Sequence, residues 1–153
     1  MSSTNYPYKE DGILPDGLRV PDIPVMNLLI VRKDRRKGLL GESVVDTGFD
    51  GAIYANLNLA EFLEGATPKR TMPLQAAGRD VTCEVFDVEC CIMNRNFKAV
   101  LPLGSVDAYC PVDPVDLFED VIIGRAILNR ITLQLNGQVA KLFPKGSMAK
   151  EDG

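Results

Sequence analysis

Histidine is absent from this sequence of 153 residues. Its absence excludes a Ser-His-Asp or Cys-His nucleophile within the chain, and any zinc site that needs an imidazole ligand. Long apolar runs are also missing. No uninterrupted stretch approaches the roughly 18 residues that a membrane-spanning helix needs, so we expect no membrane partner. The chemistry open to this chain therefore uses carboxylates, hydroxyls, thiols, lysine, arginine or backbone groups.

Cysteine is scarce, and its spacing is not that of a metal site. None of the four cysteines forms a Cys-x-x-Cys pair, the usual spacing of thiolate ligands; they are Cys83, Cys90, Cys91 and Cys110. We therefore expect packed or free thiols, no metal and no cofactor. The N-terminal residues are polar and lack the apolar run of a signal peptide, so the expected compartment is the cytoplasm.

The charge balance offers no overall field that would attract nucleic acid. Seventeen basic and twenty-one acidic residues give a net charge of −4. Residues 32–37 form a local basic cluster, Arg-Lys-Asp-Arg-Arg-Lys, with a charge of +4. Binding of an anion or nucleic acid is one interpretation of this cluster, but a solvated hairpin tip is more typical. We expect no nucleic-acid partner.

The length and the apolar content of 46% are sufficient for one domain with a single core. Residues 1–22 contain three prolines and two Asp-Gly pairs, so this segment is predicted to be an extended arm. Residues 23–143 are predicted to form the domain, and residues 144–153 to form a polar tail.

Short β-rich runs separated by turn signals predict a mainly β fold with one or two short helices. The helices are expected at residues 57–63 and 125–129. Residues 104–120 carry prolines and several acidic residues and are predicted to be a surface loop. Three hairpins are predicted, over residues 25–45, 71–88 and 131–143.

The sequence Asp46-Thr47-Gly48 follows a predicted buried strand and could form a compact catalytic loop. A carboxylate is placed there beside a small hydroxyl residue, and the glycine allows a ligand to approach the backbone. On these three residues alone, a simple turn after a strand is the more common interpretation. A calcium loop is excluded, because Leu57 falls where an EF-hand needs a bidentate glutamate.

A second segment, Val121-Ile122-Ile123-Gly124-Arg125, contains a glycine, Gly124, that lies 78 residues after Asp46. With these two motifs in this order, the chain resembles the retroviral-type, or retropepsin-like, aspartic proteases, and in particular their small bacterial and archaeal relatives with a Thr-Gly-Phe-x-Gly sequence. The resemblance covers about residues 24–143. The matching residues are Asp46, Thr47, Gly48, Asp50, Ile122, Ile123, Gly124, Arg125 and Leu128.

The resemblance implies a retropepsin-like closed β fold, the acid protease fold. It implies that Gly124 allows one strand to pass beneath the catalytic loop. It also implies an ion pair between Asp50 and Arg125 that braces this loop. Phe49 stands where retroviral enzymes commonly have a small residue, so the shape of the nearest substrate pocket does not follow from the family.

The family also has a hairpin flap that holds an extended substrate by strand addition. Here the flap is expected at residues 74–82, with Ala77 and Gly78 at the tip. A plain surface hairpin is the alternative interpretation of these residues.

Hydrolysis of an amide by carboxyl groups needs two of them, one charged to activate water and one protonated. Two carboxyl groups in contact share one proton and titrate as a coupled pair. The chain has one Asp-Thr-Gly sequence, so a symmetric homodimer would have to supply two copies of Asp46.

We therefore expect a hydrolase, an aspartic endopeptidase that acts as a homodimer on a peptide or protein substrate. Asp46 would be catalytic, and Thr47 and Gly48 would fix its loop. The alternative hypothesis is a non-catalytic module that keeps this fold for dimerisation or for binding a peptide.

Overall fold

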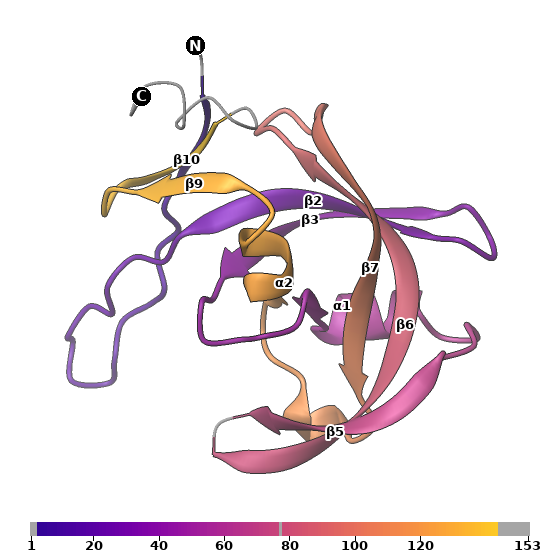
Figure 1. Cartoon of the computed structure of the whole chain (residues 1–153). Helices are drawn as coiled ribbons and strands as arrows, with labels where there is room; N and C mark the ends of the chain where they lie inside the picture. The colour runs from indigo at the N-terminus through magenta and orange to yellow at the C-terminus, as the bar shows by residue number, and fades with distance from the viewer. Residues whose placement is uncertain (1–2, 77, 144–153) are drawn as a thin grey trace.

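The computed structural model describes residues 3–76 and 78–143 (Figure 1). This part of the chain is mainly β, with two short α-helices and one 3₁₀ turn; they are α1 Leu57–Phe62, α2 Arg125–Leu128 and the turn Pro114–Asp116. The strands are β1 Thr4–Pro7, β2 Val25–Arg32, β3 Gly38–Val45, β4 Ile53–Tyr54, β5 Arg70–Ala76, β6 Arg79–Met93, β7 Ala99–Pro111, β8 Val121–Ile123, β9 Thr132–Leu135 and β10 Val139–Phe143. The predicted polar tail, residues 144–153, lies outside the described residues.

Six strands close into a barrel. Their order is β2-β3-β8-β4-β7-β6, and β6 pairs again with β2. Strand β6 makes this closure possible because it is fifteen residues long. Its second half pairs with β2 and its first half pairs with β5, so the β5–β6 hairpin extends beyond the barrel. In Figure 1 this hairpin curves under the lower end of the barrel.

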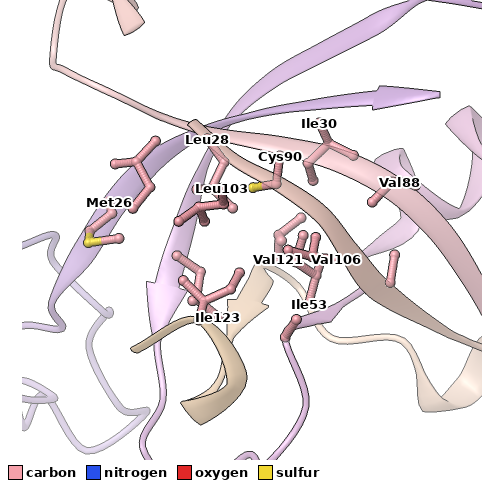
Figure 2. Close-up of a cluster of buried hydrophobic side chains, with 14 of the residues drawn as sticks. Met26, Leu28, Ile30, Ile53, Val88, Cys90, Leu103, Val106, Val121 and Ile123 are labelled. Carbon is pink, nitrogen blue, oxygen red and sulfur yellow. The ribbon is translucent and has the colours of Figure 1, made fainter. Parts of the chain in front are cut away.

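Alternating apolar residues of the strands fill the barrel interior. Figure 2 shows Leu28, Ile30 and Cys90 among the side chains that meet there, and all three are at most 3% exposed. Burial raises the pKa of the Cys90 thiol to about 12, and the neighbouring Cys91 adds to the shift. Cys90 therefore acts as a small apolar core residue. All four cysteines are free.

Most predicted local elements are confirmed. The three predicted hairpins are present as β2–β3, β5–β6 and β9–β10. Helix α1 begins after Asn56, whose side-chain oxygen accepts a hydrogen bond from the Leu59 amide. This N-cap satisfies an amide that the first turn otherwise leaves without a partner. Helix α2 begins directly after Gly124.

The prediction of a surface loop over residues 104–120 was wrong for residues 104–111 and is confirmed for residues 112–120, which contain a 3₁₀ turn but no strand and have no buried residue. Strand β7 continues to Pro111 and pairs with β6 along most of its length. Val106 and Ala108 point into the core, and each is at most 7% exposed. Gly104, with a φ of +73°, lies beside a shift in the β6–β7 register and allows the strand to bend and continue.

The N-terminal segment belongs partly to the fold. Strand β1 pairs with β10 in a separate three-stranded sheet, β1-β10-β9. Tyr6 is 2% exposed, and its hydroxyl donates a hydrogen bond of 2.5 Å to the Met93 carbonyl. Burial raises the pKa of Tyr6 to about 12. Within the described ranges, no helix has the length and apolar character needed to cross a membrane.

Candidate functional site

The Asp46 loop lies where two strands of the barrel end together. Strand β3 runs parallel to β8, with Val45 paired to Ile123, and the Asp46 amide donates a hydrogen bond of 2.9 Å to the Ile123 carbonyl. The Gly48 amide donates a hydrogen bond of 2.8 Å to Asp46 Oδ1. Asp46 and Thr47 are both exposed. The loop therefore presents a carboxylate whose orientation is fixed by a backbone donor.

Gly124 lies directly against this loop, as the sequence predicted. A Cβ atom at position 124 would lie 2.3 Å from the Gly51 carbonyl oxygen and 2.5 Å from the Phe49 carbonyl oxygen. Two backbone hydrogen bonds join this segment to the loop after Asp46. The Gly124 amide donates to the Ala52 carbonyl, and the Arg125 amide donates to the Phe49 carbonyl. Only a residue without a Cβ fits at this crossing.

The predicted ion pair between Asp50 and Arg125 is not formed. Both side chains are exposed, and the salt bridges within residues 3–76 and 78–143 do not include this pair. The loop is braced instead by the backbone of Arg125, whose amide lies 2.8 Å from the Phe49 carbonyl oxygen. A backbone brace needs no particular side chain at positions 50 and 125.

A cavity of about 120 Å³ opens beside Asp46. Its wall is largely aromatic and aliphatic; the lining residues are Asp46, Gly48, Phe49, Tyr54, Leu74, Gln75, Phe118 and Ile122. The Phe49 ring packs edge-to-face on Tyr54, with ring centroids 5.9 Å apart. Tyr54 also lies against Phe118, at 4.8 Å between centroids. The cavity thus places the Asp46 carboxylate beside aromatic and aliphatic side chains, with the polar side chain of Gln75 also in its lining.

The hairpin predicted as a flap borders this cavity. Leu74 and Gln75 of β5 line it, close to the turn that joins β5 to β6. Gly78 in this turn is exposed and has a φ of +78°, a conformation that glycine adopts without strain. Ala77, the other predicted tip residue, lies outside the described residues.

An ion pair connects the hairpin to the opposite wall of the cavity. Arg79, the first residue of β6, pairs with Asp116 of the 3₁₀ turn. The Tyr54 hydroxyl donates a hydrogen bond of 2.8 Å to the Asp116 carbonyl. Burial raises the pKa of Tyr54 to about 12, so the hydroxyl stays protonated and remains a donor at neutral pH. Two contacts therefore fix the segment that carries Phe118.

Sequence reasoning missed Tyr54, Phe118 and the Arg79–Asp116 pair. The sequence does contain one signal for part of this arrangement: Val106, Ala108 and Cys110 alternate, which indicates a strand rather than a loop. No local pattern predicts that an arginine of one hairpin meets an aspartate 37 positions later, because such a contact depends on the tertiary fold.

Comparisons with known proteins add no assignment. No protein-family model matches the chain, and no curated protein matches it in sequence. In the part of the chain that the structure describes, no three or more Cys, Asp or Glu side chains are grouped so as to hold a metal ion.

Proposed function

We propose that the protein is an aspartic endopeptidase of the retropepsin-like type, active as a homodimer with one Asp46 from each subunit. The observation that carries this proposal is the Asp46 loop itself. Its carboxylate is exposed, is oriented by the Gly48 amide, and lines a cavity that the β5–β6 hairpin borders through Leu74 and Gln75. The glycine crossing at Gly124 gives this loop a rigid base.

The reaction requires that two Asp46 carboxyl groups hold one proton between them. The charged carboxyl takes a proton from water as the water oxygen bonds to the amide carbon of the substrate. The protonated carboxyl gives its proton to the carbonyl oxygen. The carboxyl that took the proton from water then gives it to the amide nitrogen as the C–N bond breaks. The other carboxylate takes a proton from a hydroxyl of the tetrahedral species, which leaves a carboxylic acid, an amine and one proton shared by the two carboxyl groups.

One chain supplies only half of this pair. Among the residues that the structure describes, Asp46 is the single aspartate that lines the cavity. A two-fold axis beside Asp46 would place an identical carboxyl opposite it, because symmetric dimers bring identical residues together near their axis. The exposure of Asp46 and Thr47 leaves this side of the loop free to meet a second copy.

The β5–β6 hairpin is suited to hold an extended peptide. It projects beyond the barrel, and near its turn β5 pairs on one side with β6. The other side of β5 is a sheet edge whose backbone groups are available for strand addition. Leu74, Phe49 and Phe118 give an apolar side chain of the peptide a surface to pack against.

The experiment is peptide hydrolysis by the full chain and by Asp46→Asn, across acid to neutral pH. The substitution is nearly isosteric, so fold and dimer should be retained while the rate falls to background. Asp87→Asn is the matched control, because Asp87 is exposed and pairs only with Lys33 among the described ion pairs. It should retain full activity.

Two outcomes would overturn the proposal. Hydrolysis that persists in pure Asp46→Asn would remove this residue from the mechanism. An inactive wild-type protein at every pH, with a peptide still bound beside Asp46, would favour the alternative hypothesis of a non-catalytic dimerisation or peptide-binding module.

A further inference from the structure

Residues 9–23 form a β-ribbon that stands off the body of the protein. Its base is a pair of hydrogen bonds between Lys9 and Ile23, of 2.9 and 2.8 Å, and an isolated bridge joins Ile13 to Arg19 nearer the tip. Near the tip, the Leu14 amide donates to the Leu18 carbonyl at 2.8 Å. In Figure 1 the ribbon is the indigo loop that extends at the lower left. It is a preformed element with its own backbone pairing.

The ribbon presents apolar side chains to solvent. Ile13 is 72% exposed, Leu18 is 64% exposed and Leu14 is 45% exposed. They lie within six positions of one another and place three exposed apolar side chains near the ribbon tip, beside the exposed Asp16. A single exposed leucine is ordinary, but several together on a projecting, hydrogen-bonded element are typical of an interaction surface.

The base of the ribbon is attached to the strands that carry the Asp46 site. The Pro24 carbonyl accepts a hydrogen bond of 3.0 Å from the Val45 amide, one residue before Asp46. Lys9 forms an ion pair of 2.8 Å with Asp120, one residue before β8. In Figure 1 the ribbon and the loop after β3 lie on the same side of the barrel. The ribbon therefore projects from the side where a second Asp46 would have to approach.

We propose that the ribbon of residues 9–23 docks onto a second copy of this chain and stabilises the dimer that completes the Asp46 site. This inference rests on the proposed function, which requires a second copy next to Asp46. At about 3.3 Å per residue, the ribbon reaches roughly 20 Å from its base. That length is enough for the tip to reach a second subunit whose Asp46 lies next to this one.

The charge of the ribbon argues against an anionic membrane as its occupant. Its two basic residues are outnumbered by four acidic ones; these are Glu10, Asp11, Asp16 and Asp22. Anionic lipid attracts clusters of lysine and arginine instead. In a two-fold dimer each subunit contributes one ribbon. Docking then covers Ile13, Leu14 and Leu18 of both ribbons, six apolar side chains in all.

The test is the dimer dissociation constant of the full chain, measured by sedimentation equilibrium over a range of concentrations. Ile13→Asp combined with Leu18→Asp should raise this constant by about 100-fold or more, since each substitution acts on both copies. The control is Leu57→Asp, because Leu57 is also an exposed leucine, 57% exposed, on helix α1, which lies apart from the ribbon in Figure 1. It should leave the constant unchanged.

A second measurement keeps the inference testable if the double variant folds poorly. A photo-crosslinking amino acid in place of Leu18 should give a covalent dimer, with the crosslink mapping to the other subunit. Crosslinks confined to a single chain, or an unchanged dissociation constant in the folded double variant, would overturn the inference.

The two proposals can fail separately. At concentrations that restore its dimer, the double variant should regain the wild-type hydrolysis rate per dimer. A dimeric, hydrolytically active wild type with an unaffected double variant would refute only the ribbon's role. A wild type that is monomeric at every concentration would contradict both proposals.

Discussion

Gly124 lies so close to Phe49 that a methyl group on its α-carbon would be 2.5 Å from the Phe49 carbonyl oxygen. Gly124 directly follows β8, which lies between β3 and β4 in the barrel. The contact therefore joins the end of this strand to the loop that carries Asp46. Two of the three nearest obstructing atoms are backbone oxygens, of Phe49 and Gly51, which cannot turn aside as a flexible side chain can. The geometry of the candidate site therefore depends on Gly124, which does not line the cavity itself.

Gly124→Ala should destabilise the protein by about 3 kcal/mol, at the upper end of the usual cost of overpacking. For a chain of this size, such a loss lowers the melting temperature by roughly 10 °C. The matched control is Gly41→Ala in β3, where an added Cβ meets no atom within 4 Å. Thermal unfolding followed by circular dichroism compares the two, and equal melting temperatures would show that the crossing is not tight.

Asp116→Asn should loosen the hairpin over the cavity with little change in global stability. The Arg79 side chain is 59% exposed, so its pair with Asp116 contributes about 1 kcal/mol or less to unfolding. Hydrogen exchange of the Gly78 and Arg79 amides should nevertheless rise several-fold, because this pair ties the turn to the opposite wall. Asp80→Asn on the same hairpin serves as the control. Unchanged exchange in Asp116→Asn would mean that the pair does not hold the hairpin.

Asp107 should contribute stability that disappears in acid. Burial raises the pKa of its carboxyl, but hydrogen bonds and charge from Lys69 and Arg70 outweigh burial and hold the pKa below the ordinary value. The ionised carboxyl is therefore favoured in the folded state. Its contribution is complete above the unfolded-state pKa of about 3.9 and is lost as the pH falls through the lower folded-state pKa.

The measurement for Asp107 is the free energy of unfolding of wild type and Asp107→Asn between pH 7 and pH 2. The two should differ by about 1 kcal/mol at neutral pH and converge at the acid end. The control is Asp11→Asn, at an exposed position of the ribbon, which should have the wild-type free energy of unfolding at neutral pH. A difference for Asp107→Asn that stays constant with pH would contradict the assignment of its partners.

The local elements of this fold could be predicted because local rules decide them. The hairpin over residues 131–143 carries an Asn-Gly turn, and Asn56 caps helix α1 through its own side chain. The second half of strand β7 was assigned to a loop because residues 104–120 together carry several acidic residues and prolines. Asp107 is accommodated in the strand by two cations from β5 and the residue before it, Arg70 and Lys69.

Only the part of the candidate site that lies within the two short sequence motifs, around Asp46 and around Gly124, could be predicted. Asp46, Gly48 and Gly124 follow from short sequences whose backbone geometry is self-contained. The Asp50–Arg125 pair failed because the Arg125 backbone already braces the loop and leaves both side chains free to face solvent. The aromatic wall came from separate strands and loops, so no spacing in the sequence could reveal it.

The central claim is that hydrolysis needs Asp46 from two subunits at once, and mixed dimers test it most directly. Wild type and Asp46→Asn are mixed at constant total concentration, allowed to exchange subunits, and assayed for peptide hydrolysis. At equal amounts, about one quarter of the dimers carry two Asp46 residues. The account therefore predicts that the rate falls to about one quarter of the pure wild-type value and varies as the square of the wild-type fraction. A rate of about one half, in direct proportion to the wild-type chain, would contradict it.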